Sequence, residues 1–527
     1  MAEIKRWFQS WRTSRGRLSL RKIVQVISTA VILGLLVWSQ RVFYLNQRGG
    51  TAEFLINLPI RLDPLVMLLQ MISNGILLPL GFISLITVGL TLVFGRVWCG
   101  WVCPVGAIQD WLSFPGNKFS ISPPADSWRS VKFLILLAMV ILAIFSNLSF
   151  LIFDPLTILY RTVTTFFLPA ADQLITLIER ALFRIPILQT PVGAVDSWIR
   201  PGILPVVPDQ FQAGTLFGAV FLGILFLNLM IPRFYCRYLC PLGGMLGWIA
   251  RSSWFRVRVG ESCTSCESCV SVCPTGAIRN QNGITIDSAE CTMCMVCPTA
   301  CPALDLSILP GDISRVPQDY DPERRMILLT AGAAALGGGV LGAGPAKQRI
   351  EPHLIRPPGV LNDELLQKCI RCGECSEVCP TNVIQPALLE TGLEGLWTPL
   401  LIPRIGYCDY SCNACGQICP VGAIPALSLE EKRDTVIGKA YVDHDRCLAW
   451  ADLEDCIVCE EMCPVPEKAI DLEEAVIEEP DGSFRTILQP VVDRERCIGC
   501  GICENKCPVS GAAAIRVHTL PLDCLSV

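Results

Sequence analysis

Histidine is almost absent from this chain of 527 residues, which contains only His353, His444 and His518. No histidine precedes residue 353, so the apolar first part of the chain has no histidine pair to hold a haem, and no C-x-x-C-H sequence offers a covalent haem site. A Rieske centre needs two histidines beside its cysteines, which three scattered residues do not supply. The sequence therefore predicts no haem, and each histidine is interpreted as an ordinary surface residue.

Charged residues are also scarce, because 17% of the chain is charged and 51% is hydrophobic, with a mean hydropathy of +0.47. This composition predicts a membrane protein. The charges are unevenly divided: residues 1–346 carry 27 Lys and Arg against 19 Asp and Glu, whereas residues 347–527 carry 16 against 29. A basic part suits the cytoplasmic leaflet, and an acidic part suits solvent and a basic partner.

Four apolar segments are predicted to cross the membrane. The first follows seven Lys and Arg within residues 1–22 and shows no cleavage site, so its N-terminal end is predicted to lie inside. The second is interrupted at Asn74-Gly75 and Pro79, which predicts a short interfacial piece followed by a helix from about Ile76. The predicted spans are residues 23–38, 64–94, 133–153 and 214–231.

The loops between these spans predict their orientation. The loops after the second and fourth spans are rich in Lys and Arg, whereas the loops 40–63 and 154–213 are poorer, so these two are predicted to lie outside. The loop 154–213 contains the apolar stretch FFLPAADQLITLIERALF, which predicts an amphipathic helix at the membrane interface.

A fifth apolar segment, 326–344, follows Arg324-Arg325 in the stretch PERRMILLTAGAAALGGGVLGAGPA. The arginine pair has two interpretations, a positive flank of an ordinary span or a twin-arginine export signal. A domain with thiolate-held clusters is better loaded before export to an oxidising compartment, which favours the signal. Both interpretations place residues 347–527 outside. Cleavage after Ala346 matches the small-residue rule poorly.

Cysteine, with 29 residues, carries the chemistry. Two stretches, CTSCESCVSVCP and CTMCMVCPTACP, have the spacing C-x2-C-x2-C-x3-C-P, in which three thiolates hold one [4Fe–4S] cluster and the fourth serves its neighbour. Zinc sites would need only paired cysteines and do not explain this spacing. The predicted ligand sets are Cys263, Cys266, Cys269 with Cys301, and Cys291, Cys294, Cys297 with Cys273.

Four further motifs predict four more clusters, six in all, and each ends in Cys-Pro. Two of them have a longer first gap, which indicates inserted loops. The motifs are Cys369/Cys372/Cys375/Cys379, Cys408/Cys412/Cys415/Cys419, Cys447/Cys456/Cys459/Cys463 and Cys497/Cys500/Cys503/Cys507. The fourth cysteines allow two pairings: a nested one, first motif with fourth and second with third, or a sequential one.

Two C-x3-C-P copies stand at span ends, in RVWCGWVCPVGAIQD and RFYCRYLCPLGG, and contain Cys99, Cys103, Cys236 and Cys240. Together these thiols could hold a metal or cluster, or cycle between dithiol and disulfide; the alternative is packing of small residues at helix ends. The remaining Cys524 lies in a C-terminal CLSV, whose match to the prenylation pattern is interpreted as coincidence.

Iron–sulfur clusters need an electron donor or acceptor in the membrane, which is most simply a quinone. The candidate quinone contacts are Asp154 and Arg161, with Glu53, Arg61 and Asp63 as further charged residues near span ends; the alternative is that they anchor the interface. A G-x-G-x-x-G pattern at Gly337 lacks a preceding strand and lies in an apolar span, so a nucleotide site is not expected there.

Residues 1–320 resemble the NapH-type membrane subunit of periplasmic nitrate reductase systems, with four spans, two C-x3-C-P copies and a two-cluster ferredoxin. That family is related to the membrane parts of nitrous oxide reductase regulators and of copper-handling oxidase assembly proteins. Residues from Arg324 onward resemble NapG, a twin-arginine-exported subunit with four [4Fe–4S] clusters. The resemblance implies a fused quinol dehydrogenase module, which oxidises quinol and passes electrons to a periplasmic acceptor, although the two subunits are usually separate.

The expected fold is a multidomain α-helical membrane protein with small α+β ferredoxin-like domains. The expected domains are a membrane domain (1–250), a cytoplasmic two-cluster domain (251–320), a fifth span (321–346) and a periplasmic four-cluster domain (347–527) in a bacterial inner membrane. The expected partners are lipid, quinone and a periplasmic c-type cytochrome or molybdoenzyme, with no nucleic acid. Two alternative functions stay open: a redox assembly factor working through the C-x3-C-P pair, and a wire in a larger complex whose quinone site is on another subunit.

Overall fold

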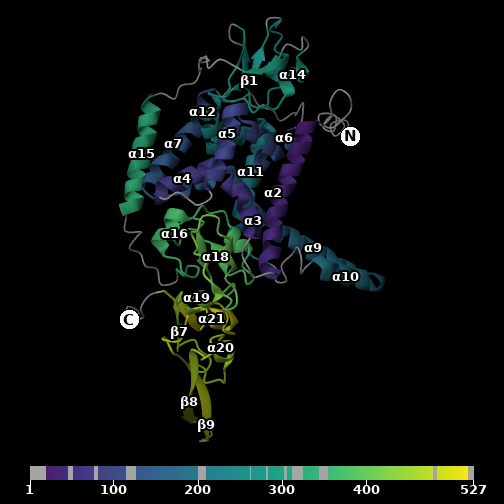
Figure 1. Ribbon diagram of the computed structural model, residues 1–527. Coiled ribbons are helices and arrows are strands. Elements are labelled where there is room, and N and C mark those ends of the chain that lie inside the picture. Colours follow the sequence, from purple (N-terminus) through teal and green to yellow (C-terminus); the bar gives the residue numbers. More distant parts are fainter. Residues whose placement is uncertain are drawn as a thin grey trace. The chain divides into compact units, whose positions relative to one another are not determined.

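The computed structural model describes residues 19–45, 51–75, 81–113, 126–199, 209–260, 263–280, 283–301, 306–310, 324–343, 354–478 and 483–519 (Figure 1). Residues 1–18, His353, Ala346 and Cys524 lie outside the described residues. The chain divides into two compact units. Unit 1 comprises residues 1–37, 55–162 and 216–342, and unit 2 comprises residues 38–54, 163–215 and 343–527.

Apolar helices dominate unit 1. Two helical stretches, Leu20–Ser39 and Ser127–Ile144, are long and apolar enough to cross a membrane, and the bent pair Phe54–Arg61 and Pro64–Asn74 would make a third. Shorter apolar helices are present at Gly81–Phe94, Gly214–Met230, Pro241–Ala250 and Arg325–Gly339. The helices of this part are α2 (Leu20–Leu45), α3 (Thr51–Arg61), α4 (Pro64–Asn74), α5 (Ser84–Phe94), α7 (Val131–Ile144), α8 (Pro155–Thr162), α11 (Gly214–Met230) and α15 (Arg324–Ala343).

The helices differ from the predicted spans in three ways. The second segment is interrupted at Gly75, where α4 ends in a left-handed cap, and just before the segment, at Asp63, α3 and α4 are bent by 89° relative to each other. Ile76 and Pro79 lie outside the described residues. The third helix ends at Ile144, because Ser146 has a φ of +57° and the 3₁₀ turn η4 (Ser149–Phe153) follows. The fourth, α11, has 17 residues, which is short for a straight span.

The two C-x3-C-P copies form the same local structure. A π-helical turn is followed by an extended cysteine and then by a helix that begins with proline: η2 (Trp98–Val102) precedes α6 (Pro104–Leu112), and η7 (Tyr235–Leu239) precedes α12 (Pro241–Ala250). The Cys103 and Cys240 amides each donate to the carbonyl five residues earlier, at 2.9 Å. Proline suits the first helical position because it has no N–H to satisfy there.

The two-cluster domain also belongs to unit 1. Strand β1 (Phe255–Val259) pairs antiparallel with β4 (Leu306–Pro310), and β2 (Ile278–Asn280) pairs with β3 (Ile284–Ile286). Two short helices, α13 (Ser268–Ser271) and α14 (Val296–Ala300), complete it. The core includes Cys269, Ile278 and Met293, so cysteines are a large part of what this small domain buries.

A buried carboxylate, Glu290, joins this domain to the membrane helices. Lys132 donates to it at 2.5 Å, and Arg96 and Arg129 lie 3.4 and 3.8 Å away. Burial alone would raise the pKa of Glu290, but these three cations hold it at about 2. Arg96 also donates to the Ala289 carbonyl at 2.9 Å, so the carboxylate and its cations are paired although all of them are buried.

Unit 2 contains the loop predicted to carry an amphipathic helix. The π-helical turn η5 (Val163–Phe167) leads into α9 (Leu168–Phe183), η6 (Pro186–Leu188) and α10 (Gln189–Ile199). Leu174, Leu177 and Ile178 of α9 are each about half exposed or more, whereas Asp172 is buried, so its solvent face is apolar. Such a face suits the interface of a membrane.

Within residues 354–478 and 483–519, six antiparallel strands and six short helices form the four-cluster domain of unit 2. The strand pairs are β5 (Ile384–Pro386) with β6 (Pro399–Leu401), β7 (Lys439–Val442) with β10 (Ile515–His518), and β8 (Ile470–Glu478) with β9 (Phe484–Val492). The helices are α16 (Asn362–Lys368), α17 (Glu374–Glu377), α18 (Ala414–Ile418), α19 (Leu429–Asp434), α20 (Val458–Glu461) and α21 (Ile502–Lys506). Cysteines again pack within the core, beside Ile384, Leu401 and Ile470.

The four-cluster domain is attached to the loop 163–215 of its own unit. Asn382 and Gln385 donate side-chain N–H groups to the Gln210 carbonyl at 2.8 and 3.0 Å, and the Gln212 amide donates to Gln385 at 3.2 Å. Thr164 of η5 donates to Glu377 at 3.0 Å. Gln385 is fully buried, so these bonds belong to a packed contact.

Replacing Glu290 with glutamine should destabilise the contact between the two-cluster domain and the helices. The substitution leaves Lys132, Arg96 and Arg129 buried without their carboxylate, which typically costs about 3–5 kcal/mol. The measurement is the urea midpoint of the detergent-solubilised full chain. Glu267→Gln in the same domain, where the side chain is exposed, is the matched control, and an unchanged midpoint for Glu290→Gln would contradict this account.

Candidate metal centres

The compact cysteine motifs share an unusual backbone. In each compact motif, the residues just before and just after the second cysteine both have positive φ. These pairs are Ser265 and Glu267, Met293 and Met295, Arg371 and Gly373, and Gly499 and Gly501. Left-handed backbone costs a non-glycine residue about 1–2 kcal/mol, so it persists where the surroundings require it. Here it winds the chain so that three cysteines face one centre.

The two loosened motifs are built differently. The residue after the second cysteine has negative φ in both: Asn413 has a φ of −132° and Ile457 a φ of −117°. Their longer first gaps give the chain enough length to turn without the left-handed pair. The inserted loops therefore change the path of the backbone in these two motifs. The cysteines of both motifs are nevertheless grouped in fours with a cysteine of another motif.

The two-cluster domain brings cysteines from both of its motifs together. Cys273 of the first motif lies within electrostatic range of Cys291, Cys294 and Cys297 of the second. Cys301 of the second packs on the same small core as Cys269 of the first. This is the exchange of fourth cysteines that the spacing predicts, and ligation of iron by these groups stays a prediction.

Two cavities in the four-cluster domain are lined by cysteines from two motifs each. Cys447, Cys456 and Cys459 meet Cys507 around one of them. Cys463 meets the first three cysteines of the last motif around the other; these are Cys497, Cys500 and Cys503. Each cavity therefore presents four sulfurs, which is the donor set of a [4Fe–4S] cluster.

The first two motifs of this domain exchange cysteines in the same way. Cys419 lies in electrostatic range of Cys369, Cys372 and Cys375. In turn, Cys379 lies near the other three cysteines of the second motif, which are Cys408, Cys412 and Cys415. The structure thus groups the thiols of sequential motifs and not of nested ones, and ligation of iron by these groups stays a prediction. Motifs adjacent along the chain are joined by short connections, which favours their pairing.

The four groups lie in a row, and we call them sites A to D. Site A is Cys369, Cys372, Cys375 and Cys419; site B is Cys408, Cys412, Cys415 and Cys379; site C is Cys497, Cys500, Cys503 and Cys463; site D is Cys447, Cys456, Cys459 and Cys507. Cys375 of A neighbours Cys415 of B, and Cys503 of C neighbours Cys459 of D. The Cys408 amide of B donates to the Cys500 carbonyl of C at 2.8 Å.

Burial keeps these thiols neutral when no metal is bound. It raises the pKa of Cys419 and Cys500 to about 11 and that of Cys408 and Cys459 to about 12, and neighbouring sulfurs contribute to the rise in Cys408 and Cys459. Iron binds the deprotonated thiolate, so loading a site displaces protons and replaces repulsion with metal–sulfur bonds. Within the described part of the chain, no three Cys, His, Asp or Glu side chains are spaced to hold a single metal ion.

The C-x3-C-P copies bring their four cysteines together as well. Cys99, Cys103, Cys236 and Cys240 are 4–8% exposed and lie within electrostatic range of one another. We call them the four-thiol set. A signal that sequence reasoning missed accompanies them: each copy reads R-x2-C-x3-C-P-x-G, with Arg96 and Gly106 in the first and Arg233 and Gly243 in the second.

The arginine of each copy of this extended motif lies near the glycine of the other copy. A Cβ atom on Gly243 would come within 2.7 Å of Arg96 Nη2, and one on Gly106 would lie 3.9 Å from Arg233 Nη2. A larger residue at Gly243 would therefore obstruct Arg96, whereas one at Gly106 would first meet the Cys99 carbonyl, at 2.6 Å. Both guanidinium groups are buried, at 1% and 0% exposure, so the four-thiol set lies beside two positive charges.

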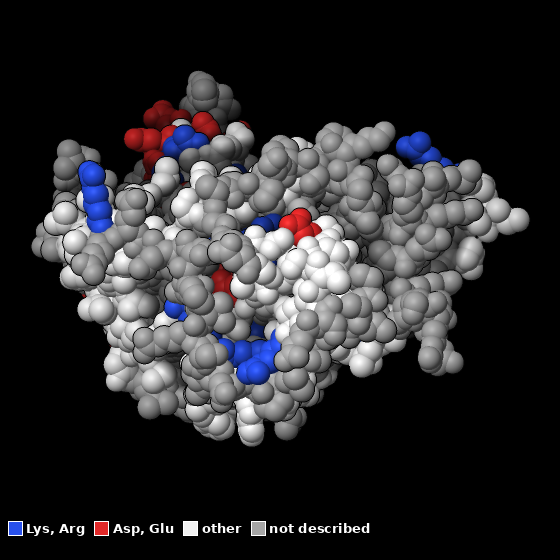
Figure 2. All heavy atoms as spheres, turned by 90° about the horizontal axis from the view of Figure 1, so that it is seen from above, with Lys and Arg blue, Asp and Glu red and all other residues white. Residues whose placement is uncertain are grey.

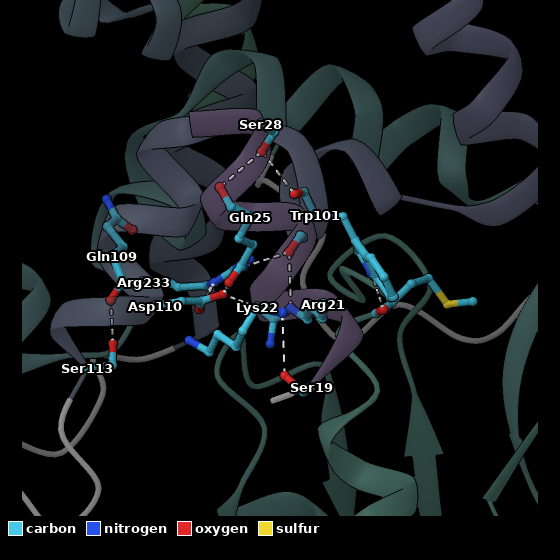
Figure 3. A network of polar contacts seen from close by, with 12 residues as sticks. Ser19, Arg21, Lys22, Gln25, Ser28, Trp101, Gln109, Asp110, Ser113 and Arg233 are labelled. Carbon is cyan, nitrogen blue, oxygen red and sulfur yellow. Dashed lines mark hydrogen bonds and ion pairs between the residues drawn. The ribbon is translucent and has the colours of Figure 1, made fainter. Parts of the chain in front are cut away.

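Asp110 of α6 balances the charge of Arg233. It accepts from Arg233 Nε and Nη2, both at 2.7 Å, and also from Arg21 and, at 2.8 Å, from Gln25 (Figure 3). Gln25 in addition donates to the Gly100 carbonyl at 2.9 Å. The start of α2 is thereby held against the first C-x3-C-P copy. Elsewhere, on the face drawn in Figure 2, charged side chains stand in small separate groups among uncharged ones.

The candidate quinone contacts divide between two places. Asp154 lies against Asp63, and both are fully buried. The Arg161 guanidinium lies over the ring of Phe217, 4.7 Å from its centroid. The sequence marks Asp63 only as a further charged residue near a span end. It does not predict the contact with Asp154, which lies 91 positions later in the chain.

The two described histidines lie beside aromatic rings. His444 is exposed and stacks on Trp450 at 3.9 Å between ring centroids. His518 was expected at the surface but is only 3% exposed and meets the edge of Tyr441 at 4.2 Å. It lies in β10, whose pairing with β7 buries it.

Comparison with known proteins gives matches to iron–sulfur families. A family model described as a 4Fe-4S binding domain matches residues 76–122, 213–260 and 415–428, and a second with the same description matches 258–279, 366–385 and 490–510. The first two ranges contain the four-thiol set. No solved structure matches the chain.

Among individual relatives, the methylamine utilization ferredoxin-type protein MauM of Paracoccus denitrificans is 39% identical over 197 residues, which are 36% of this chain and 83% of the relative. The ferredoxin-type protein NapG of Escherichia coli is 33% identical over 202 residues, which are 38% of this chain and 84% of the relative. NapG of Haemophilus influenzae is 32% identical over 211 residues, covering 38% and 73%.

Serine substitutions should reveal which cysteines share a site. Cys456→Ser and Cys507→Ser should each remove the iron of site D, and the double variant should lose no more than either alone. Cys456→Ser combined with Cys463→Ser should lose the iron of two sites, C and D. Iron and acid-labile sulfide per chain are the measurement.

The double variants serve as controls for each other, because both carry two lost thiols in the same domain. Equal iron loss in the two doubles would contradict the sequential pairing. Collapse of the whole domain would show as loss of more than two sites.

Proposed function

The chain belongs to the family of the MauM and NapG ferredoxin-type proteins, and from this premise we propose that it is a membrane-bound quinol dehydrogenase module. It takes electrons from a membrane quinol, such as menaquinol, and passes them to a periplasmic redox protein. The observation that carries the proposal is the row of four-thiol sites A to D. A [4Fe–4S] cluster, when bound, accepts and releases one electron at a time.

The row of sites suits transfer over distance. A sulfur of site A lies near a sulfur of site B, and a backbone hydrogen bond joins site B to site C. A sulfur of site C lies near one of site D. Each site therefore has a neighbouring site to which an electron could pass. An enzyme that used one cluster for local chemistry would have no need of this order. With the two sites of residues 263–301, we propose six [4Fe–4S] clusters, held by the 24 cysteines of the six motifs.

The surface around site D supports a basic partner. Asp452, Glu454, Asp455 and Glu461 are exposed close in sequence to Cys456 and Cys459. A positively charged protein would be steered towards such a surface, with an association rate that falls as salt is added. We propose a periplasmic acceptor of that charge, such as a c-type cytochrome, as the partner at this end; a molybdoenzyme is the second partner class.

Contacts within each unit support the proposed orientation. Arg96, Arg129 and Lys132, from loops or helix ends predicted to lie inside, contact Glu290 of the two-cluster domain. Gln210, from the loop 154–213 predicted to lie outside, contacts the four-cluster domain. We therefore propose a cytoplasmic two-cluster domain and a periplasmic four-cluster domain, in a NapH-type membrane part fused to a NapG-type part through α15.

The four-thiol set is proposed to be redox-active or metal-binding, next to the two-cluster domain. Arg233 lies within electrostatic range of both Cys236 and Cys294, so the set adjoins a predicted cluster ligand. The match of a 4Fe-4S family model around both copies is consistent with this role. The alternative function, a factor that reduces metals or thiols on a client, is less well supported because these thiols are 4–8% exposed and a client protein has little access to them.

Quinol should reduce the clusters of the isolated protein. The full chain in lipid nanodiscs is mixed anaerobically with a menaquinol analogue, and bleaching of the visible iron–sulfur absorption is followed. We expect partial or full bleaching with quinol and full bleaching with dithionite, which is the control for intact clusters. Bleaching by dithionite alone would place the quinone site on another subunit.

Protease treatment should test the orientation. In intact spheroplasts, external protease should cleave the four-cluster domain, for instance at the exposed β8–β9 strands, while residues 263–301 resist until the cells are lysed. Cleavage is read with antibodies to each domain. Protection of both domains before lysis would contradict the proposed arrangement.

A further inference from the structure

Two aspartates from distant parts of unit 1 meet where two helices begin. Asp63 caps α4: its Oδ1 accepts from the Leu65 and Val66 amides at 2.8 and 3.3 Å. Asp154 precedes α8, and its Oδ2 accepts from the Thr157 amide at 2.9 Å. Both side chains are 0% exposed. We call them the carboxyl pair.

Helix capping accounts for only one oxygen of each aspartate. Asp63 Oδ2 and Asp154 Oδ1 are buried and have no donor among the described residues. The two side chains are close enough to hydrogen-bond to each other. A carboxylate only accepts hydrogen bonds, so this contact requires a proton on one of the two groups.

The surroundings favour a pair that holds one proton and one negative charge. Two ionised carboxylates in contact repel strongly where water is excluded, which is why such pairs share a proton. The N-termini of α4 and α8 point at the pair and stabilise the remaining charge. The pair is thus poised to accept one further proton.

The place of the pair in the fold connects it with electron transfer. It lies at the 89° break between the helices 54–61 and 64–74, and broken helices within membrane domains are characteristic of binding sites and ion pathways. Tyr235 of η7, which donates to the Phe153 carbonyl, neighbours both Asp154 and three cysteines of the four-thiol set. The tyrosine is therefore within electrostatic range of both one member of the pair and these thiols.

We propose that Asp63 and Asp154 are the proton acceptor for oxidation of a membrane quinol, beside the four-thiol set. The inference rests on the proposed quinol dehydrogenase function and assigns its proton step. A quinol loses two electrons and two protons as its two O–H bonds break. The electrons leave singly for the iron–sulfur sites, and the pair takes one proton at a time, passing the first on before it accepts the second.

Asparagine substitutions separate this role from helix capping. Asparagine caps helices as well as aspartate does, and its amide can donate to the facing carboxyl, so Asp63→Asn and Asp154→Asn should fold with an undiminished urea midpoint. In either variant the asparagine amide donates to the remaining carboxylate and favours its ionised form, so the site takes up a proton far less readily than the wild-type pair does. We expect quinol-driven bleaching of the clusters in nanodiscs to slow about 100-fold, which is typical for loss of a general base, while dithionite still bleaches them fully.

Infrared difference spectra supply a readout that does not depend on turnover. Between the oxidised and quinol-reduced wild-type protein, a carboxylic-acid C=O band should appear, shift in D2O, and be missing from both variants. Asp209→Asn, which alters another buried carboxyl in unit 2, is the matched control and should keep both the band and the rate.

The outcomes distinguish failure of the proton-acceptor inference from failure of the proposed quinol dehydrogenase function. Wild-type rates in both asparagine variants would overturn the inference and leave the quinol dehydrogenase function standing. Absence of a carboxyl band from the wild-type protein would overturn it too, even if the variants did not fold. If quinol fails to bleach the wild-type protein, the proposed function falls and the inference falls with it.

Discussion

Each candidate cluster site takes three thiols from one stretch of chain and the fourth from another, and the rest of the structure follows from this requirement. The strands are paired only two by two, and the cores of the ferredoxin-like domains contain cysteines beside a few aliphatic residues such as Ile384 and Leu401. Domains this small bury little apolar surface for their size. Metal–thiolate bonds at these candidate sites would join neighbouring motifs and would therefore contribute directly to folding as well as to electron transfer.

The second constraint is the cost of burying charge in an apolar protein. The chain meets it by pairing: Glu290 faces three cations, and Asp110 receives Arg233, Arg21 and Gln25. Glu290 contacts one of the two arginines of the C-x3-C-P copies, Arg96, and Asp110 contacts the other, Arg233. The pairing leaves positive charge next to the four-thiol set, where thiolate or an anionic cluster would be stabilised.

The proposed proton and electron steps use the same elements in unit 1. The helix caps that start α4 and α8 are also the carboxyl pair, and the π-turn that carries Tyr235 also carries Cys236. Irregular backbone in a membrane protein persists where it is buried against protein or serves a site. The broken helix at Asp63 and the two π-turns are among the irregular points of this unit, and each adjoins groups for which we propose redox or proton chemistry.

The sequence by itself determined the cofactor type and predicted its thiols, because C-x2-C-x2-C-x3-C-P spacing reflects the geometry of one cluster and is local. It also predicted the break at Gly75, the helix of the fifth segment and the apolar face of α9, which depend on short-range preferences. Tertiary structure decided what depends on residues far apart in the chain. The sequential pairing of motifs, the approach of Arg96 and Arg233 to the glycine of the other copy, the burial of His518 and the meeting of Asp63 with Asp154 arise from packing between elements, which no local pattern records.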